Sequence, residues 1–184
     1  MSARILVLTA GYGEGHNAAA RALVAAFDAA RGAGTARLED IYALAAPRLN
    51  EIVRRGYLGV INRAPNAWNA VYRWLDRSPQ APRLLRAMGR ERRVLGALIA
   101  RERPDAICCT YPGYAFMLEV LARRGVGAVP FFNVVTDSIS INSLWWRGGA
   151  AGWFVPNEDS AVVMRQGGVD PARIHVTGFP VQAF

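Results

Sequence analysis

Residues 5–17 read Ile5-Leu6-Val7-Leu8-Thr9-Ala10-Gly11-Tyr12-Gly13-Glu14-Gly15-His16-Asn17. A short apolar run with β-branched residues that leads into glycines is typical of a buried strand followed by a tight loop. From residue 16 to residue 30, apolar side chains recur at helical spacing. The opening therefore predicts a strand, a glycine loop and a helix in direct succession.

The rest of the chain continues this alternation. We predict further strands at 37–41, 105–110, 130–135, 152–155 and 174–177, and helices at 113–124 and 158–166. Apolar strands that alternate with helices pair in parallel through right-handed crossovers. The sequence thus predicts an α/β fold, a Rossmann-like doubly wound parallel sheet, with one domain over residues 1–184. Because the chain ends just after a predicted strand, we expect a C-terminal partner domain that this chain does not contain.

The segment 47–103 is an insert in this pattern and is predicted to be helical throughout. Prolines at 65, 79 and 82 are expected to break it into about three helices. It carries thirteen arginines and four acidic residues, and it accounts for the whole excess in the net charge of +8. Two interpretations stay open: its aromatic residues pack on the sheet under solvated arginines, or the segment docks on an anionic membrane. We expect no nucleic-acid partner, because no recognition motif accompanies the charge.

Composition excludes several classes of protein. A hydrophobic content of 52% with 20% charged residues is that of a globular domain, not a disordered one. No stretch approaches the ~20 apolar residues that span a bilayer. The two cysteines, Cys108 and Cys109, are neighbours in an apolar run and match no metal-ligand spacing. We expect a cytosolic protein without a metal site.

Polar residues follow three of the predicted strands. The glycines after the first strand let a ligand approach the backbone, and the positive end of the helix dipole favours a neutral, proton-accepting imidazole at His16. Asp137 follows the strand at 130–135 and is expected to orient or polarise His16, since strand ends converge on one crevice. Tyr111 either lines that crevice or forms a turn. The plainer alternative is that His16 and Asp137 only cap a helix and a turn.

The glycine loop also partly fits a dinucleotide fingerprint. Gly11 and Gly13 occupy its first two positions, but His16 stands where a third small residue belongs. Asp40, after the second predicted strand, would then be the ribose-binding acid. A nicotinamide-dependent enzyme and a non-catalytic module that binds a nucleotide or an anionic lipid are therefore alternatives.

Residues 5–19 closely resemble the opening of the monogalactosyldiacylglycerol synthase and processive diacylglycerol glucosyltransferase family. Further matches are Tyr111-Pro112, Val135-Thr136-Asp137, and the stretches 154–158 and 167–181. Their order and spacing cover nearly the whole chain and correspond to the family's N-terminal domain.

The resemblance implies the N-terminal half of a GT-B glycosyltransferase. This half would bind a lipid acceptor such as diacylglycerol, and the absent C-terminal domain would bind UDP-galactose or UDP-glucose. The complete enzyme would be an inverting hexosyltransferase of glycolipid biosynthesis that needs no cofactor, and this chain alone would be inactive. We expect it in the cytoplasm, peripherally associated with the inner face of the membrane.

Site residues are carried over from the matching motifs. His16 matches the proposed catalytic base, and Asp137 matches the aspartate of a Thr-Asp element. The substrate-binding residues are predicted to be Gly13, Gly15, Asn17, Tyr111, Thr136 and Asn142, and the membrane-docking residues Trp68, Tyr72, Arg73, Trp74 and Arg77. Family members usually carry a histidine shortly after the aspartate, but residues 138–145 contain none. Asn142 forms hydrogen bonds but is no base near neutral pH, which leaves His16 as the only evident one.

Overall fold

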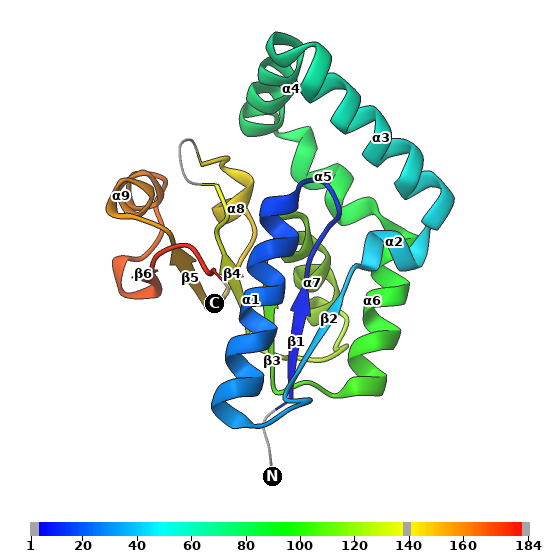
Figure 1. Ribbon diagram of the computed structural model, residues 1–184, viewed down its shortest axis with the longest axis vertical. Helices are drawn as coiled ribbons and strands as arrows, with labels where there is room; N and C mark the ends of the chain where they lie inside the picture. Colours follow the sequence, from blue (N-terminus) through cyan, green and yellow to red (C-terminus); the bar gives the residue numbers. More distant parts are fainter. Residues whose placement is uncertain (1–3, 138–140, 182–184) are drawn as a thin grey trace.

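The computed structural model of the chain describes residues 4–137 and 141–181. Its centre is a six-stranded sheet in the order β2-β1-β3-β4-β5-β6, with every neighbouring pair parallel (Figure 1). The strands are β1 (Ile5–Leu8), β2 (Ala36–Glu39), β3 (Ala106–Cys109), β4 (Phe131–Val134), β5 (Gly152–Val155) and β6 (Ile174–Val176). The predicted α/β parallel sheet is confirmed.

Helices cover both faces of the sheet. Successive side chains of a strand point to opposite faces, so each face carries apolar residues on which helices pack. Leu6 and Leu8 pack with α6 (Gly89–Glu102) and α7 (Gly113–Arg123), whereas Val7 packs with α1 (Glu14–Arg31) on the other face. Each fully buried leucine stabilises the fold by ~1.5–3 kcal/mol relative to an exposed one. Cys108 and Cys109 are buried on opposite faces, as their apolar surroundings predict.

A smaller core lies beside β5, next to the β6 edge of the sheet. Trp145 from α8 (Leu144–Arg147) is fully buried there against Trp153 of β5 and Met164 of α9 (Glu158–Gln166). The short helices α2 (Ile41–Ala45) and α8 were not predicted, since neither spans two turns of periodic pattern.

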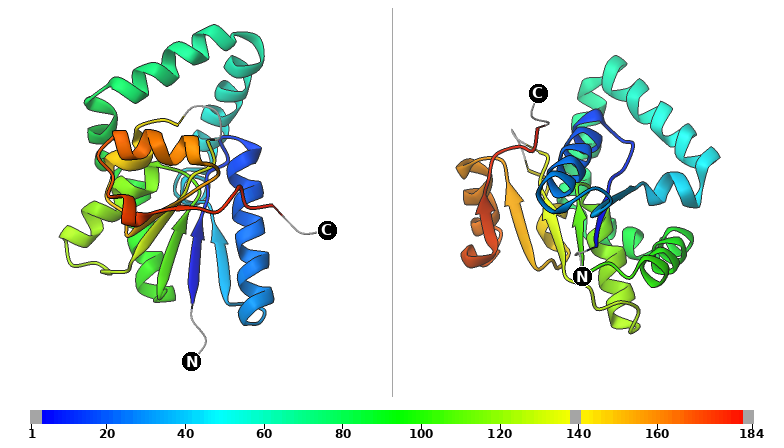
Figure 2. Two further views of the ribbon diagram at one scale, coloured as in Figure 1. Left: turned by 90° about the vertical axis from the view of Figure 1, so that its left-hand side faces the viewer. Right: turned by 60° about the horizontal axis from the view of Figure 1, so that its bottom comes forward.

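The insert folds into α3 (Pro47–Arg63), α4 (Pro65–Arg77) and α5 (Gln80–Ala87), and then continues into α6. The predicted break at Pro82 is wrong: the residue lies in the first turn of α5, where a missing N–H costs no intrahelical hydrogen bond. The chain instead turns at Met88. In two views, α3 and α4 stand beyond the end of the sheet to which the strands point (Figures 1 and 2).

Candidate active site

The site begins where the strand order changes direction. The chain leaves β1 for β2 on one side and later crosses to β3 on the other, so a crevice opens beyond the carboxyl ends of β1 and β3. The loop after β1 reaches α1 through Gly13, whose φ of 143° favours glycine. A Cβ atom at Gly13 would lie 3.8 Å from both the His16 ring and the Tyr57 hydroxyl. The insert helix α3 therefore meets the glycine loop at this point.

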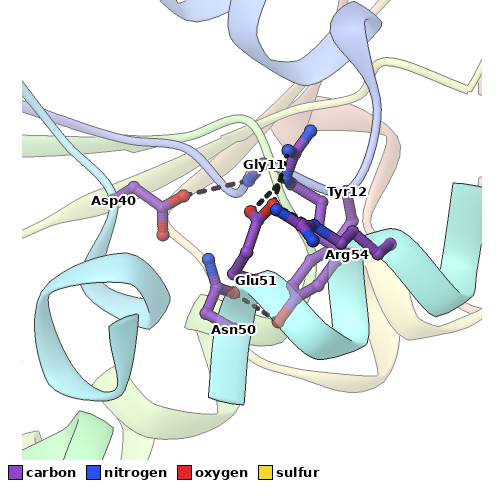
Figure 3. A network of polar contacts seen from close by, with 7 residues as sticks. Gly11, Tyr12, Asp40, Asn50, Glu51 and Arg54 are labelled. Carbon is purple, nitrogen blue, oxygen red and sulfur yellow. Dashed lines mark hydrogen bonds and ion pairs between the residues drawn. The ribbon is translucent and has the colours of Figure 1, made fainter. Parts of the chain in front are cut away.

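Asp40 holds the glycine loop in place. Its carboxylate accepts a hydrogen bond from the Gly11 N–H at 3.0 Å (Figure 3). It also caps α2 by accepting from the Ala43 N–H at 3.0 Å. In the dinucleotide alternative this carboxylate would hold a ribose. Here both of its oxygens bind backbone N–H groups, which gives Asp40 a structural role.

The first insert helix is fastened to the same loop. The Tyr12 hydroxyl donates to Asn50 of α3 at 2.7 Å, and Arg54 forms an ion pair with Glu51 of the same helix (Figure 3). A Cβ atom at Gly11 would lie 3.6 Å from the Arg54 side chain. The loop after β1 is thus enclosed between Asp40 and α3.

His16 lies in the first turn of α1 with its ring half-buried. Its Nδ1 atom lies 2.7 Å from the Thr136 hydroxyl, which follows β4. Burial lowers the pKa of His16, and the negative charge of Asp137 and a hydrogen bond with the Thr110 backbone oppose this shift only in part. The imidazole is therefore neutral at pH 7 and able to accept a proton.

Asp137 lies beside His16, but the hydrogen bonds that its carboxylate accepts from the described residues come from other groups. One carboxylate oxygen accepts from the Tyr72 hydroxyl at 3.0 Å, from the Trp145 indole N–H at 3.0 Å and from the Asn142 N–H at 3.4 Å. Thr136 therefore orients the imidazole, while Asp137 acts on it through its charge.

A cavity of about 380 Å³ opens beside these groups. Its wall is largely aromatic and aliphatic: Tyr12, His16, Tyr42, Val53, Tyr57, Tyr72, Leu75, Leu85, Met88, Tyr111, Pro112, Asp137, Asn142 and Leu144. Burial raises the pKa of Tyr111, and that of Tyr12 to about 12, so both are neutral phenols at pH 7. Among these lining residues the only full charge is that of Asp137. Such a wall suits an uncharged, partly apolar molecule that carries a hydroxyl group.

A family model described as monogalactosyldiacylglycerol (MGDG) synthase matches residues 16–181, from the histidine of the glycine loop to the end of the described chain. The chain belongs to the MGDG synthase family. The predicted resemblance is thereby confirmed.

Similar proteins support the same family. Processive diacylglycerol beta-glucosyltransferases of Bacillus subtilis and Bacillus cytotoxicus are 25% and 27% identical over 181 residues. The matches cover 97% of this chain but only 46% and 45% of those relatives. The chain thus spans about half the length of the curated relatives it matches.

Two of the six substrate-binding residues predicted for this MGDG synthase family chain line the cavity, and a third contacts His16 beside it. Tyr111 and Asn142 line it, and Thr136 contacts His16. The amide of Asn142 is already engaged: it donates to the Tyr72 carbonyl at 3.3 Å and accepts from the Leu144 N–H at 3.0 Å. Asn17 accepts from the Thr9 hydroxyl at 2.9 Å and so ties the end of β1 to α1. These contacts leave Gly13 and Gly15 as the open part of the loop.

The predicted membrane-docking residues of this family member separate onto different faces of α4. Arg73 and Arg77 are exposed, and Trp74 is 52% exposed. The side chain of Tyr72 lines the cavity, and its hydroxyl binds Asp137. The Trp68 side chain lies outside the described part of the structure.

Sequence reasoning missed most of the aromatic wall. Five of the six tyrosines line the cavity, yet Tyr12, Tyr42 and Tyr57 were not proposed as site residues. Their positions could have indicated this: Tyr12 lies in the glycine loop, Tyr42 in the segment after β2, and Tyr57 in the first helix of the insert. Within the described residues, no cluster of three or more histidine, cysteine or acidic side chains suits a metal, and no helix is long and apolar enough to cross a bilayer.

Proposed function

We propose that this chain is the acceptor-binding half of an inverting glycosyltransferase that transfers a hexose from UDP-galactose or UDP-glucose to a lipid alcohol such as diacylglycerol. One observation carries the proposal: a neutral imidazole, oriented by Thr136, faces an apolar cavity at the switch point of the sheet. The names of the relatives supply the class of reaction and of acceptor.

In the proposed reaction, the acceptor hydroxyl lies in the cavity next to His16. The imidazole takes the hydroxyl proton as the oxygen forms a bond to the anomeric carbon of the sugar. The bond from that carbon to the UDP oxygen breaks on the opposite face, and UDP leaves with the electron pair. The negative charge of Asp137 stabilises the imidazolium ion formed in this step. No proton transfer requires a metal or another cofactor.

The charge of the cavity wall favours a neutral acceptor. The described lining residues include no arginine, so a phosphate group there would stand beside Asp137 without a counter-charge. This argues against the alternative of a module that binds an anionic lipid in this cavity. Diacylglycerol is uncharged and carries one free hydroxyl, which is the chemistry that His16 requires.

We propose that the exposed face of the insert brings the enzyme to its lipid. Arg73, Trp74 and Arg77 share α4 with Tyr72, and apolar side chains of α3 such as Leu49 and Ile52 are 60% and 68% exposed. Basic residues near an anionic membrane contribute ~1 kcal/mol each. The proposed location is the inner face of the cytoplasmic membrane.

Replacement of His16 tests this function in the complete gene product. His16→Ala is expected to lower kcat for transfer from a UDP-sugar to diacylglycerol by about 10²–10⁴-fold. The matched control is His175→Ala, which removes the other histidine, an exposed residue of β6. Unchanged transfer in His16→Ala would overturn the assignment of the base, and no transfer by the unmodified protein from either UDP-sugar would favour the binding module.

A further inference from the structure

The inner face of α4 belongs to the site. The Tyr72 hydroxyl donates to the Asp137 carboxylate at 3.0 Å, and the Tyr72 backbone carbonyl accepts from the Asn142 amide at 3.3 Å. The tyrosine is therefore held at both its main chain and its side chain by the segment that follows β4.

The C-terminal turn of α4 is fastened to the same segment. Asp76 accepts from the Ser143 N–H through its carboxylate and from the Ser143 hydroxyl through its carbonyl, both at 2.6 Å. Arg147 donates to the Ser78 carbonyl at 2.9 Å. These bonds prevent α4 from sliding along its axis, so the Tyr72 hydroxyl keeps a defined position next to Asp137.

The orientation of Asp137 depends on these donors. Its bonded oxygen receives one hydrogen bond from the insert, through Tyr72, and one from α8, through Trp145. Charge support for His16 requires the carboxylate to stay near the ring, since the interaction weakens with distance. Without the Tyr72 donor, only the Trp145 indole N–H and the longer bond from the Asn142 N–H hold this oxygen, so the carboxylate is less firmly fixed beside the ring.

We propose that Tyr72 is a positioning residue, which holds the Asp137 carboxylate where its charge supports the protonated imidazole of His16. The inference rests on the proposed function of His16 as the base. The insert would then contribute to the chemistry as well as to membrane docking, because its Tyr72 side chain holds the carboxylate that acts on His16.

The surroundings of His16 fix the sign of the expected effect. The titratable groups near it are Asp137 after β4, Tyr111 after β3 and Tyr57 of α3, and both tyrosines have raised pKa values. Asp137 is therefore the charged group among them at pH 7, and it raises the pKa of His16. Loss of its support must lower that pKa further.

An NMR titration of the 184-residue chain tests the inference without lipid or sugar. The chain contains two histidines, and the signal of His175 on β6 serves as internal reference. Asp137→Asn is expected to lower the pKa of His16 by about 1 unit, and Tyr72→Phe by roughly half of that. The matched control is Val71→Ala, which changes an exposed neighbour on the same helix and should leave the His16 titration unchanged.

The double variant separates positioning from a general effect on packing. If Tyr72 acts through Asp137, Tyr72→Phe/Asp137→Asn titrates like Asp137→Asn alone. A full additional shift in the double variant, or an unshifted His16 in either single variant, would overturn the inference. In the complete gene product, Tyr72→Phe should lower kcat severalfold with little change in KM. When Asp137→Asn is already present, adding Tyr72→Phe should leave kcat unchanged. Failure of the proposed function is recognised separately, by an active His16→Ala enzyme.

Discussion

The hydroxyl of Thr136 lies 2.7 Å from Nδ1 of His16, although 120 positions separate the two residues in the sequence. Because α1 fixes only the histidine backbone, this bond and the hydrogen bond with the Thr110 backbone together orient the ring. When Nδ1 carries the proton and donates to Thr136, the lone pair of Nε2 is left to accept the proton of an alcohol.

Removal of this bond should slow transfer without unfolding the chain. Thr136→Val keeps the shape of the side chain but loses the hydroxyl, and a hydrogen bond worth ~1 kcal/mol corresponds to about a fivefold fall in kcat. Thr136→Ser retains the hydroxyl and should recover most of the activity. Steady-state kinetics of the complete gene product decide the matter, and equal activity in all three proteins would show that Thr136 does not orient the base.

The lowered pKa of His16 predicts a dependence of activity on pH. The base is neutral above its folded pKa, which lies below the ordinary value of about 6.5. The acid limb of the kcat/KM profile, which reports the groups of the free enzyme, should therefore fall below pH 6.5. Stability follows the same group: as pH decreases below about 6.5 the unfolded chain takes up the proton first, so the free energy of unfolding falls until pH reaches the folded pKa.

The stability effect is measured as a difference between two proteins. Urea midpoints of the unmodified chain and of His16→Gln, taken between about pH 7.5 and pH 5, cancel the contributions of other groups. The unmodified chain should lose more stability over this range. A larger loss in His16→Gln would mean that the pKa of His16 is raised, not lowered.

Gly15 offers a test of ligand approach to the loop. It lies in the first turn of α1, and an added Cβ atom would meet no other atom within 4 Å, so the fold itself does not require glycine there. Gly15→Ala should leave stability unchanged or raise it by up to ~0.5–1 kcal/mol. We nevertheless expect it to lower activity by about tenfold, since the methyl group would occupy space used by the substrate.

Gly56→Ala is the matched control for this prediction. Gly56 lies in α3, is exposed, and also has no atom within 4 Å of an added Cβ. It should gain stability in the same way and keep its activity. If Gly15→Ala is as active as this control, the open loop does not contact the substrate.

The exposed side of α4 should bind anionic membranes. Replacing Arg73 and Arg77 with glutamine removes two charges, and ~1 kcal/mol for each predicts about a fivefold loss of vesicle affinity per residue. Sedimentation with vesicles that contain phosphatidylglycerol measures this. The control Arg31→Gln/Arg124→Gln removes the same charge from exposed positions at the C-terminal ends of α1 and α7. An equal loss in both pairs would mean that only net charge matters.

Apolar pattern was enough to predict the sheet but not how the insert packs. β1, β3 and β4 each fall within a predicted strand, because buried parallel strands are short, continuous apolar runs. Tyr72 and Leu75 are three positions apart, which puts them on one face of a helix. This spacing does not reveal what that face covers, and here it covers the cavity at the strand ends instead of the sheet.

The partner of His16 illustrates a finer limit. Thr136 and Asp137 are adjacent, and the sequence predicts that the aspartate orients or polarises the ring because strand ends converge on one crevice. Neighbouring side chains in an extended segment point to opposite sides. Which of the two contacts His16 therefore depends on how β4 leaves the sheet, and that is set by tertiary packing around Trp145 and Asn142.

Residues 53–88 supply Val53, Tyr57, Tyr72, Leu75, Leu85 and Met88 to the wall of the cavity. A chimera that exchanges this stretch between two relatives would therefore transfer six of the fourteen residues that line the proposed acceptor cavity, along with the surface helices. We expect the chimera to show the acceptor selectivity of the protein that donated the segment. The proposed base His16 and Thr136 would still come from the recipient protein. Engineering of new glycolipids from this scaffold would begin with the exchanged segment.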